Sequence, residues 1–265
     1  MRHRLTLTAV GVILVGGATA QAEVFDLQII DDFGAATVFR PFLPGFDDRA
    51  AITDQARFQV NGDETGSTGT LGIFTVFDID GSFIRPAAGA QAINDITVDL
   101  FPAVNNETGT GGIANAGDLS IYFTTTDVDV LDPASGIEFD NGGGTDPTGL
   151  GDQFDNLTLL SSEFEEAGIN DISRSLDTSS INSLLLDRIN AGENVRFILA
   201  SQTPGFTSNF GTGNPDDSDI FDFFGDPATI SVDVAPVPSP GAFALFGVAA
   251  AAGTRRRHVG SSRRA

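Results

Sequence analysis

The chain has 265 residues, a formal charge of −22 at pH 7, no cysteine, no tryptophan and no lysine, and its histidines, His3 and His258, lie in the terminal segments. This inventory excludes Ser–His–Asp and Cys–His nucleophile systems, zinc sites made of His or Cys, and lysine Schiff bases. Residues 23–235 contain all 36 acidic residues but seven of the 14 basic ones, and the resulting charge of −29 argues against binding to nucleic acid.

The N-terminus has the layout of a secretory signal peptide. A basic start with Arg2 and Arg4 precedes a mostly apolar stretch at 5–18, and the small residues at 18–22 offer sites for a signal peptidase. The apolar stretch is too short to span a membrane comfortably. We therefore assign residues 1–22 to a signal helix and exclude them from the fold.

The next 213 residues, 23–235, predict a single all-β domain. Short apolar or alternating runs are separated by turns rich in Gly, Asn, Asp and Pro, which favours an antiparallel β-sandwich of the jelly-roll kind. Without disulfides, the core of this domain depends on apolar burial, and 22 phenylalanines can supply it. The predicted strands are 24–30, 56–60, 71–78, 92–101, 118–125, 156–160, 194–201 and 228–234.

One or two short helices are expected within this domain. Residues 177–180 offer N-caps, Ile181, Leu184, Leu185 and Ile189 recur at helical spacing, and Gly192 stands where a C-cap would. A second helical turn is predicted at 161–168, because Ser162 and Glu165 fit a capping box.

The sharpest local signal for chemistry is Asp78-Ile79-Asp80-Gly81, at the end of a predicted strand. Alternate aspartates followed by glycine can present two carboxylates to a hard cation, as calcium loops do. No glutamate follows at the distance that an EF-hand-like loop needs, so a strand-ending turn is the alternative. Calcium is thus the cofactor suggested, with Asp78 and Asp80 as candidate ligands. Two further acidic stretches leave the same alternatives open: Asp127 with Asp129, and residues 214–219.

Carboxylates are also the main groups left for catalysis or sugar binding. Glu163, Glu165 and Glu166 could serve a glycosidase, but the sequence sets no pair at a defined separation. Sugar sites usually stack their ligand on exposed Trp or Tyr, and the single tyrosine, Tyr122, lies in an alternating run that predicts partial burial. We predict that the protein is not an enzyme.

Three stretches of the domain resemble a known family. LGIFTVFDIDGSFI (71–84), AINDITVDLFPA (92–103) and AGDLSIYFTT (116–125) are similar to the DNRLRE-type extracellular domains, as are the short helix before the strand at 194–201 and the final strand PATISVDV (227–234). The tryptophan that such domains often carry is missing here. The resemblance implies a jelly-roll sandwich on a secreted, surface-attached bacterial protein, and it implies a fold more than a function.

The C-terminal segment, 236–265, has another character. An apolar run at 241–253 is too short to cross a bilayer unassisted, and the arginines 255–257 that follow would stay on the cytoplasmic side. The arrangement resembles the PEP-CTERM sorting signals, with Pro238-Ser239-Pro240 in place of Pro-Glu-Pro, an apolar helix, and Arg255, Arg256 and Arg257. The resemblance implies recognition and cleavage by an exosortase, and delivery to the cell surface or the extracellular matrix.

Together these features predict an exported, non-enzymatic structural or adhesive protein of the bacterial surface or matrix. Its expected partners are an exosortase-type enzyme, exopolysaccharide or matrix material, and the membrane, which the tail contacts transiently. A carbohydrate- or calcium-binding adhesive module is the first alternative, and a carboxylate-dependent glycoside-active enzyme is the second.

Overall fold

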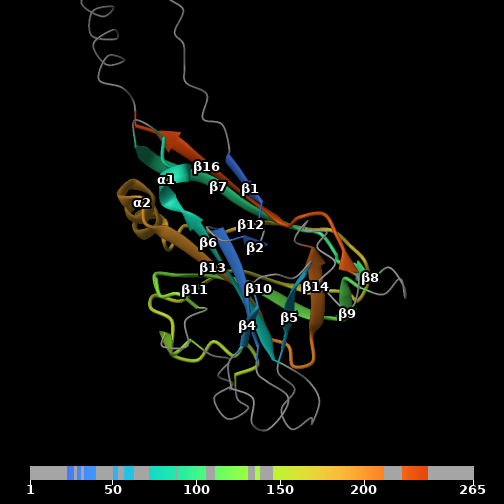
Figure 1. Ribbon diagram of the computed structural model, residues 1–265. Helices are drawn as coiled ribbons and strands as arrows, with labels where there is room; N and C mark the ends of the chain where they lie inside the picture. Colours follow the sequence, from blue (N-terminus) through green and yellow to red (C-terminus); the bar gives the residue numbers. More distant parts are fainter. Residues whose placement is uncertain are drawn as a thin grey trace, which may run out of the picture.

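The computed structural model describes residues 23–26, 29–30, 33–39, 50–52, 57–62, 72–86, 89–105, 111–130, 135–137, 146–211 and 223–237. The described chain is mostly β, all of its strand pairings are antiparallel, and it has two short helices, which confirms the predicted class (Figure 1). The predicted signal helix and the apolar tail helix fall outside the described residues.

Two main sheets make up the domain, and a two-stranded ribbon joins β8 (Val104–Asn105) to β15 (Phe223–Phe224). The smaller sheet has the order β1 (Glu23–Asp26), β16 (Thr229–Pro236), β7 (Ala90–Leu100), β12 (Ile172–Ser175). The larger sheet has the order β11 (Thr158–Glu165), β10 (Gly117–Thr124), β13 (Asn194–Ser201), β6 (Ile73–Asp80), β5 (Arg57–Asn61), β14 (Thr207–Gly211), β9 (Ile113–Asn115). β3 (Phe33–Phe39) also pairs with β6, and β2 (Ile29–Ile30) and β4 (Ala50–Ile52) pair with β3.

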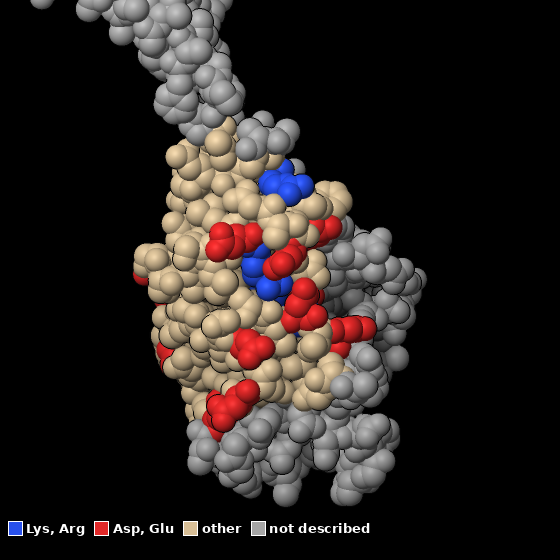
Figure 2. Space-filling model, turned by 90° about the vertical axis from the view of Figure 1, so that its left-hand side faces the viewer, with Lys and Arg blue, Asp and Glu red and all other residues tan. Residues whose placement is uncertain are grey.

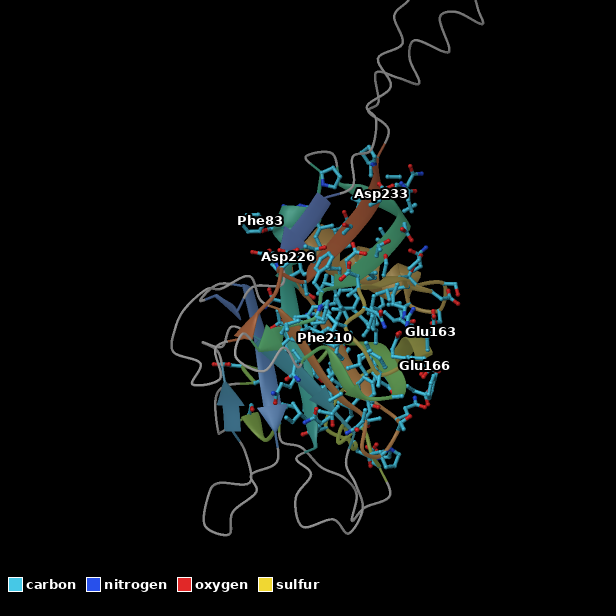
Figure 3. All side chains as sticks on the ribbon, turned by 90° about the vertical axis from the view of Figure 1, so that its right-hand side faces the viewer. Phe83, Glu163, Glu166, Phe210, Asp226 and Asp233 are labelled. Carbon is cyan, nitrogen blue, oxygen red and sulfur yellow. The ribbon has the colours of Figure 1, made fainter. Side chains whose placement is uncertain are left out.

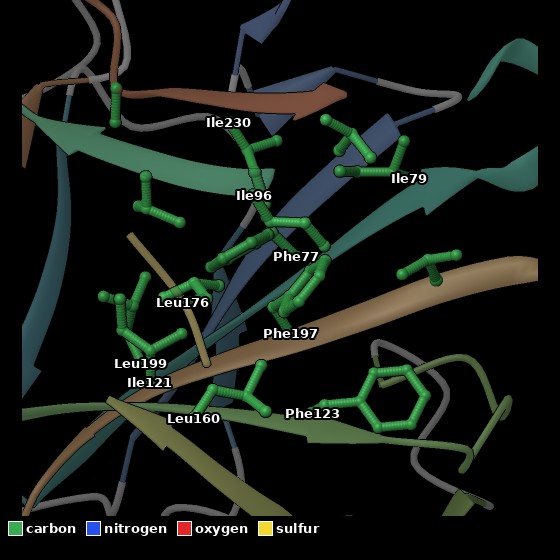
Figure 4. Close-up of a cluster of buried hydrophobic side chains, with 14 of the residues drawn as sticks. Phe77, Ile79, Ile96, Ile121, Phe123, Leu160, Leu176, Phe197, Leu199 and Ile230 are labelled. Carbon is green, nitrogen blue, oxygen red and sulfur yellow. The ribbon is translucent and has the colours of Figure 1, made fainter. Parts of the chain in front are cut away.

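The main core lies between the two sheets. Apolar residues at alternate positions of β6, β10 and β13 face apolar residues of β7 and β16, as strands with a period of two require (Figure 4). At its centre Phe197 stacks on Phe77 with ring centroids 5.6 Å apart and meets the edge of Phe123 at 6.3 Å. The abundant phenylalanines therefore supply the apolar burial that replaces disulfides.

The opposite face of the same central strands is buried too. Phe74, Val76, Tyr122, Ile198 and Ala200 on this outer face are covered by apolar side chains of the segment 125–157, which we call the cover segment. Its covering residues are Val130, Ile137, Leu150, Phe154 and Leu157. Since both faces are buried, β6, β10 and β13 have near-continuous apolar runs instead of a strict alternation.

Hydrogen bonds close the two ends of the cover segment onto each other. The backbone oxygen of Asp155 accepts from the Thr124 hydroxyl at 2.7 Å and from the Thr125 N–H at 3.0 Å. The Asp155 N–H donates to the Thr126 hydroxyl oxygen at 2.6 Å. No strand or α-helix forms in the described part of this segment, so side-chain contacts and these bonds hold it on the sheet.

The predicted long helix is present as α2 (Asn182–Ala191), with Leu185 and Ile189 buried in the main core. Gly192 ends it in the left-handed conformation, and its N–H donates to the last turn, as predicted. The predicted N-cap is wrong, because α2 begins after Ile181, which has no side-chain cap, and the Asp177 carboxylate accepts from the Ser179 N–H instead.

The helical turn predicted at 161–168 is also wrong. Residues up to Glu165 belong to β11, which pairs with β10 along its length. Ser162 shares a hydrogen bond of 2.8 Å with Ser120 on β10, and Glu165 forms an ion pair with Arg174. A capping box is a local preference, and here cross-strand bonds override it. The second short helix is instead the single turn α1 (Gly81–Ile84), directly after β6.

Candidate functional site

The structure places Asp78 and Asp80 on the outer face of β6, directly opposite Arg196 and Asn194 of β13. The Arg196 guanidinium donates from Nε to Asp78 Oδ1 and from Nη2 to Asp78 Oδ2, both at 2.7 Å. Its Nη1 donates to the backbone oxygen of Val128 at 2.8 Å. Arg196 is 3% exposed, so this two-point pair is a buried, charge-assisted contact.

A second buried arginine lies beside the first. Arg188, in the last turn of α2, donates from Nε to the Asn194 backbone oxygen at 2.6 Å and from Nη1 to the Thr125 backbone oxygen at 3.3 Å. Its Nη2 lies 3.4 Å from a carboxylate oxygen of Asp127. The two guanidiniums thus connect the sheet and α2 to the start of the cover segment, and they bring Asp78 and Asp127 to one charged cluster.

The residues of the Asp78-Ile79-Asp80-Gly81 motif already have partners within the protein. Both oxygens of Asp78 are engaged by Arg196, and Asp80 accepts from the Ser82 N–H at 2.7 Å as the N-cap of α1. Gly81 has a packing role, because a Cβ there would lie 2.5 Å from the backbone oxygen of Glu193. Each residue of the Asp-Ile-Asp-Gly motif therefore has a place in a strand-ending turn. Calcium at Asp78 and Asp80 stays a prediction.

Within the described ranges, no three His, Cys, Asp or Glu side chains come together as a metal-binding group. The acidic stretch at 214–219 lies outside those ranges.

The glutamates considered for catalysis lie at the edge of the larger sheet. Glu163 and Glu165 of β11 both pair with Arg174 of β12, the Glu163 contact being 2.8 Å. Because β11 and β12 are edge strands of different sheets, Arg174 joins the two sheets along this side. Glu166 is exposed beyond the end of β11 (Figure 3). These contacts assign Glu163 and Glu165 a structural role.

Tyr122 is 8% exposed in the outer-face cluster, which confirms the predicted burial of its ring. Its hydroxyl oxygen accepts from Gln202 Nε2 at 2.9 Å. Burial raises the pKa of the phenol, although the hydrogen bond to Gln202 acts in the opposite direction.

The outer face of the smaller sheet is polar and half exposed. The Asp95 carboxylate on β7 accepts from the Ser175 hydroxyl at 2.6 Å and from the Thr97 hydroxyl at 2.8 Å. These two bonds, that of Ser175 first, hold the pKa of Asp95 below its ordinary value. Asp233 of β16 lies opposite Asp95, so this face has two carboxylates at one register position.

The first and the last described residues of the domain lie in or directly after neighbouring strands of the smaller sheet. Glu23 of β1 pairs with Val232 in the middle of β16, and because the two strands are antiparallel, the start of β1 and the end of β16 point toward the same end of the sheet. Figure 1 shows this end next to α1. The Val237 N–H donates to the Gly89 backbone oxygen at 2.9 Å, which fixes the last described residue against the start of β7.

The residues predicted for sorting, Pro238, Ser239, Pro240 and Arg255–Arg257, lie outside the described residues. None of the helices that the structure describes has the length and the apolar character needed to cross a membrane.

The buried Arg196 has a recognisable signal in the sequence. Arg196 interrupts the apolar run Val195-Arg196-Phe197-Ile198-Leu199, in a domain where arginine is scarce. A charge in such a run requires a buried partner, because an unpaired buried charge is strongly destabilising. That partner, Asp78, lies 118 residues away and could not be identified without the strand register.

Comparison with models of protein families finds no match, and comparison with curated proteins finds none either.

Proposed function

We propose that this chain is an exported, non-enzymatic structural or adhesive protein of the bacterial cell surface or extracellular matrix. Its domain, 23–235, is a jelly-roll-like sandwich. Its tail, 236–265, is a PEP-CTERM-like sorting signal that an exosortase-type enzyme cuts near Pro238-Ser239-Pro240. Exopolysaccharide or other matrix material is the partner of the released domain.

The observation that carries this proposal is the position of the two ends of the domain. Since β1 is antiparallel to β16 and begins opposite Val232, the predicted signal segment and the predicted tail leave the smaller sheet in the same direction. A domain attached in this way is held at the membrane by one end throughout export and sorting. Every other face points away from the membrane and is ready for surface display after cleavage.

Two further features support the proposal. The strand order of the smaller sheet, with β16 between β1 and β7, joins strands that are distant in sequence, as Greek-key and jelly-roll sandwiches do. Two of the three glutamates considered for catalysis, Glu163 and Glu165, are engaged with Arg174 in a contact that holds the fold.

The proposal is tested by following the tail in a bacterium that encodes an exosortase. Arg255, Arg256 and Arg257 are replaced together by Gln, and Arg263 and Arg264 are replaced in a matched control. We expect wild type and control to reach the surface fraction with a C-terminus near residue 238, measured by mass spectrometry of the released protein. The triple variant should keep its tail and stay with the membrane. A surface protein with an intact tail in the wild type would refute the proposal.

A further inference from the structure

The end of the molecule where the chain leaves the smaller sheet exposes apolar and basic side chains together. We call Phe83, Arg85, Gly89 and Val237 the exit surface. Phe83 is 55% exposed and Val237 is 42% exposed. Arg85, two residues after Phe83, is exposed as well. An aromatic ring beside a cation is the combination that inserts at the boundary between lipid headgroups and acyl chains.

Hydrogen bonds make this surface one rigid unit. The Asn190 side chain, at the end of α2, donates to the Ala90 backbone oxygen at 2.9 Å and accepts from the Ala90 N–H at 2.8 Å. Arg85 Nη1 donates to the Asn190 backbone oxygen at 2.7 Å. With the bond from Val237 to Gly89, the turn after α1, the end of α2 and the last described residue are fixed together.

Few acidic residues lie close to the exit surface in sequence, although Asp80 caps α1 and the exposed Glu193 accepts from the Gly81 N–H through its backbone oxygen. Residues 81–94 and 234–265 contain no Asp or Glu. Figure 2 shows a basic group near the upper end of the described molecule, and acidic side chains farther down. Asp233 reaches the same height but lies on the opposite side from Phe83 in Figure 3. Arg85 therefore supplies a positive charge toward anionic headgroups on a side where the carboxylates of Asp80 and Glu193 lie nearby.

The tail brings this surface close to the membrane. The apolar run 241–253 begins four residues after Val237, a stretch that spans at most about 14 Å when fully extended. If the run enters the bilayer with its arginines on the far side, Val237 and the exit surface are held within that reach of the headgroups.

We infer that the exit surface rests on the phospholipid headgroups while the tail is in the membrane, with the Phe83 ring at the interface and the Arg85 guanidinium at the phosphates. This inference rests on the proposed sorting function and adds an orientation to it. The Phe83 side of the domain faces the membrane, and the acidic outer face of the smaller sheet points away.

The absence of tryptophan from the chain permits a direct test. Phe83→Trp places one indole on the exit surface, and Phe164→Trp, at a site 59% exposed on β11, is the matched control. Each full-length variant is produced in an exporting host and mixed with phosphatidylethanolamine–phosphatidylglycerol vesicles that contain brominated acyl chains. Flotation measures association through the tail, quenching of the indole measures contact of its site with lipid, and thermal unfolding checks that both variants fold.

We expect both variants to float, and the Phe83→Trp emission to fall about twofold with little change for Phe164→Trp, because bromine quenches at short range and an interfacial ring lies at the acyl boundary. Flotation with no quenching at position 83, or equal quenching at both positions, overturns the inference and leaves the sorting proposal standing. Failure to float refutes membrane association of the tail, and the inference with it. The Phe83→Trp variant could also float without quenching and have its tail cleaved more slowly in the cell. That result would overturn the inference and assign the exit surface to the processing enzyme.

Discussion

The two faces of the larger sheet are both buried, but by different means. The inner face packs against a hydrogen-bonded sheet and α2, and its core is a continuous set of apolar side chains around Phe197. The outer face is covered by a segment without strands or α-helices in its described part, and beyond its apolar residues lie the ion pairs of the buried arginines Arg188 and Arg196 with more exposed carboxylates. Regular structure buries one face, and individual side-chain contacts bury the other.

The two kinds of burial predict that stability is distributed unevenly between the layers. A regular layer has its backbone groups paired within the sheet or helix, so packing alone decides its contribution. The cover segment must satisfy its backbone through side chains, as Arg196 does for the Val128 carbonyl and Thr126 for the Asp155 N–H. We therefore expect the outer layer to open more easily than the inner one.

The largest effect should come from truncating one phenylalanine on each face. Phe197→Ala is expected to lower the free energy of unfolding by about 4 kcal/mol, and Phe154→Ala by about 2 kcal/mol, because the irregular cover segment can settle into the cavity and the inner layers cannot. Phe154 is the cover-segment ring that meets Phe74 edge-on at 5.8 Å. Urea unfolding of both variants measures the difference. Equal losses would contradict the contrast between the faces.

The next effect concerns the ion pair of the outer face. Asp78→Ala leaves the Arg196 guanidinium buried without its carboxylate and should lower the free energy of unfolding by about 3 kcal/mol. Asp80→Ala, two residues away on the same face, removes an N-cap and should lower it by about 1 kcal/mol. Similar losses for the two variants, measured by urea unfolding, would show that the Arg196 pair contributes little.

Titration of Tyr122 reports the tightness of the outer layer. Burial raises its pKa above the ordinary value of 10.0, so the neutral phenol stabilises the fold below that value, and this contribution is lost as the pH rises through the folded pKa. As the single tyrosine in a chain without tryptophan, it can be followed by phenolate absorbance. We expect phenolate to appear only together with unfolding. Ionisation at the ordinary pKa in a folded protein would show that the cover segment opens freely. In Tyr122→Phe this alkaline loss of stability should disappear.

A smaller effect belongs to the outer face of the smaller sheet, where Asp95 is exposed. The hydroxyls of Ser175 and Thr97 lower the pKa of Asp95, so the stability they add is present above the ordinary value of 3.8 and is lost as the pH falls through the folded pKa. Asp95→Asn should reduce stability at pH 7 by about 0.5 kcal/mol, since solvent weakens exposed contacts. The reduction should vanish in strong acid, and Ser175→Ala should follow the same course in thermal unfolding.

The smallest effect is expected from calcium. A cation at Asp78 and Asp80 competes with Arg196, and a site with a Kd near the applied concentration adds only about 0.4 kcal/mol. We expect millimolar calcium to raise the melting temperature slightly, and the rise to be lost in Asp80→Ala. An unchanged melting temperature in the wild type would remove calcium from the description of this turn.

Several elements could be predicted because their signals are local. The strand 194–201 was predicted with the bounds that the structure gives to β13, and Gly192 was predicted as the C-cap of α2. Each depends on residues within one short window, such as a run of apolar side chains or a glycine after a helical period. The strands β9, β12 and β14 gave no such signal, because three to five residues of mixed polarity do not define a period.

The candidate site depends on contacts that a short stretch of sequence does not contain. The sequence singled out Asp78 and Asp80 as a pair, and the structure keeps them on one face but gives each a separate partner, Arg196 and Ser82. The partner of Asp78 is set by the pairing of β6 with β13, which joins residues more than a hundred positions apart. Likewise, the turn predicted at 161–168 became a strand, since its bonds to Ser120 and Arg174 come from outside the window.

The sequence by itself determined the β class of the domain, its dependence on phenylalanine rather than disulfides, and the chemistry that its composition excludes. These properties follow from the composition and from the spacing of apolar residues within short stretches, which can be read without knowing the fold. The tertiary structure was needed to show that β1 pairs with the first half of β16, that the central strands are buried on both faces, and that Arg196 neutralises Asp78. Those facts depend on which distant strands become neighbours, and neighbours are chosen by the packing of the whole chain.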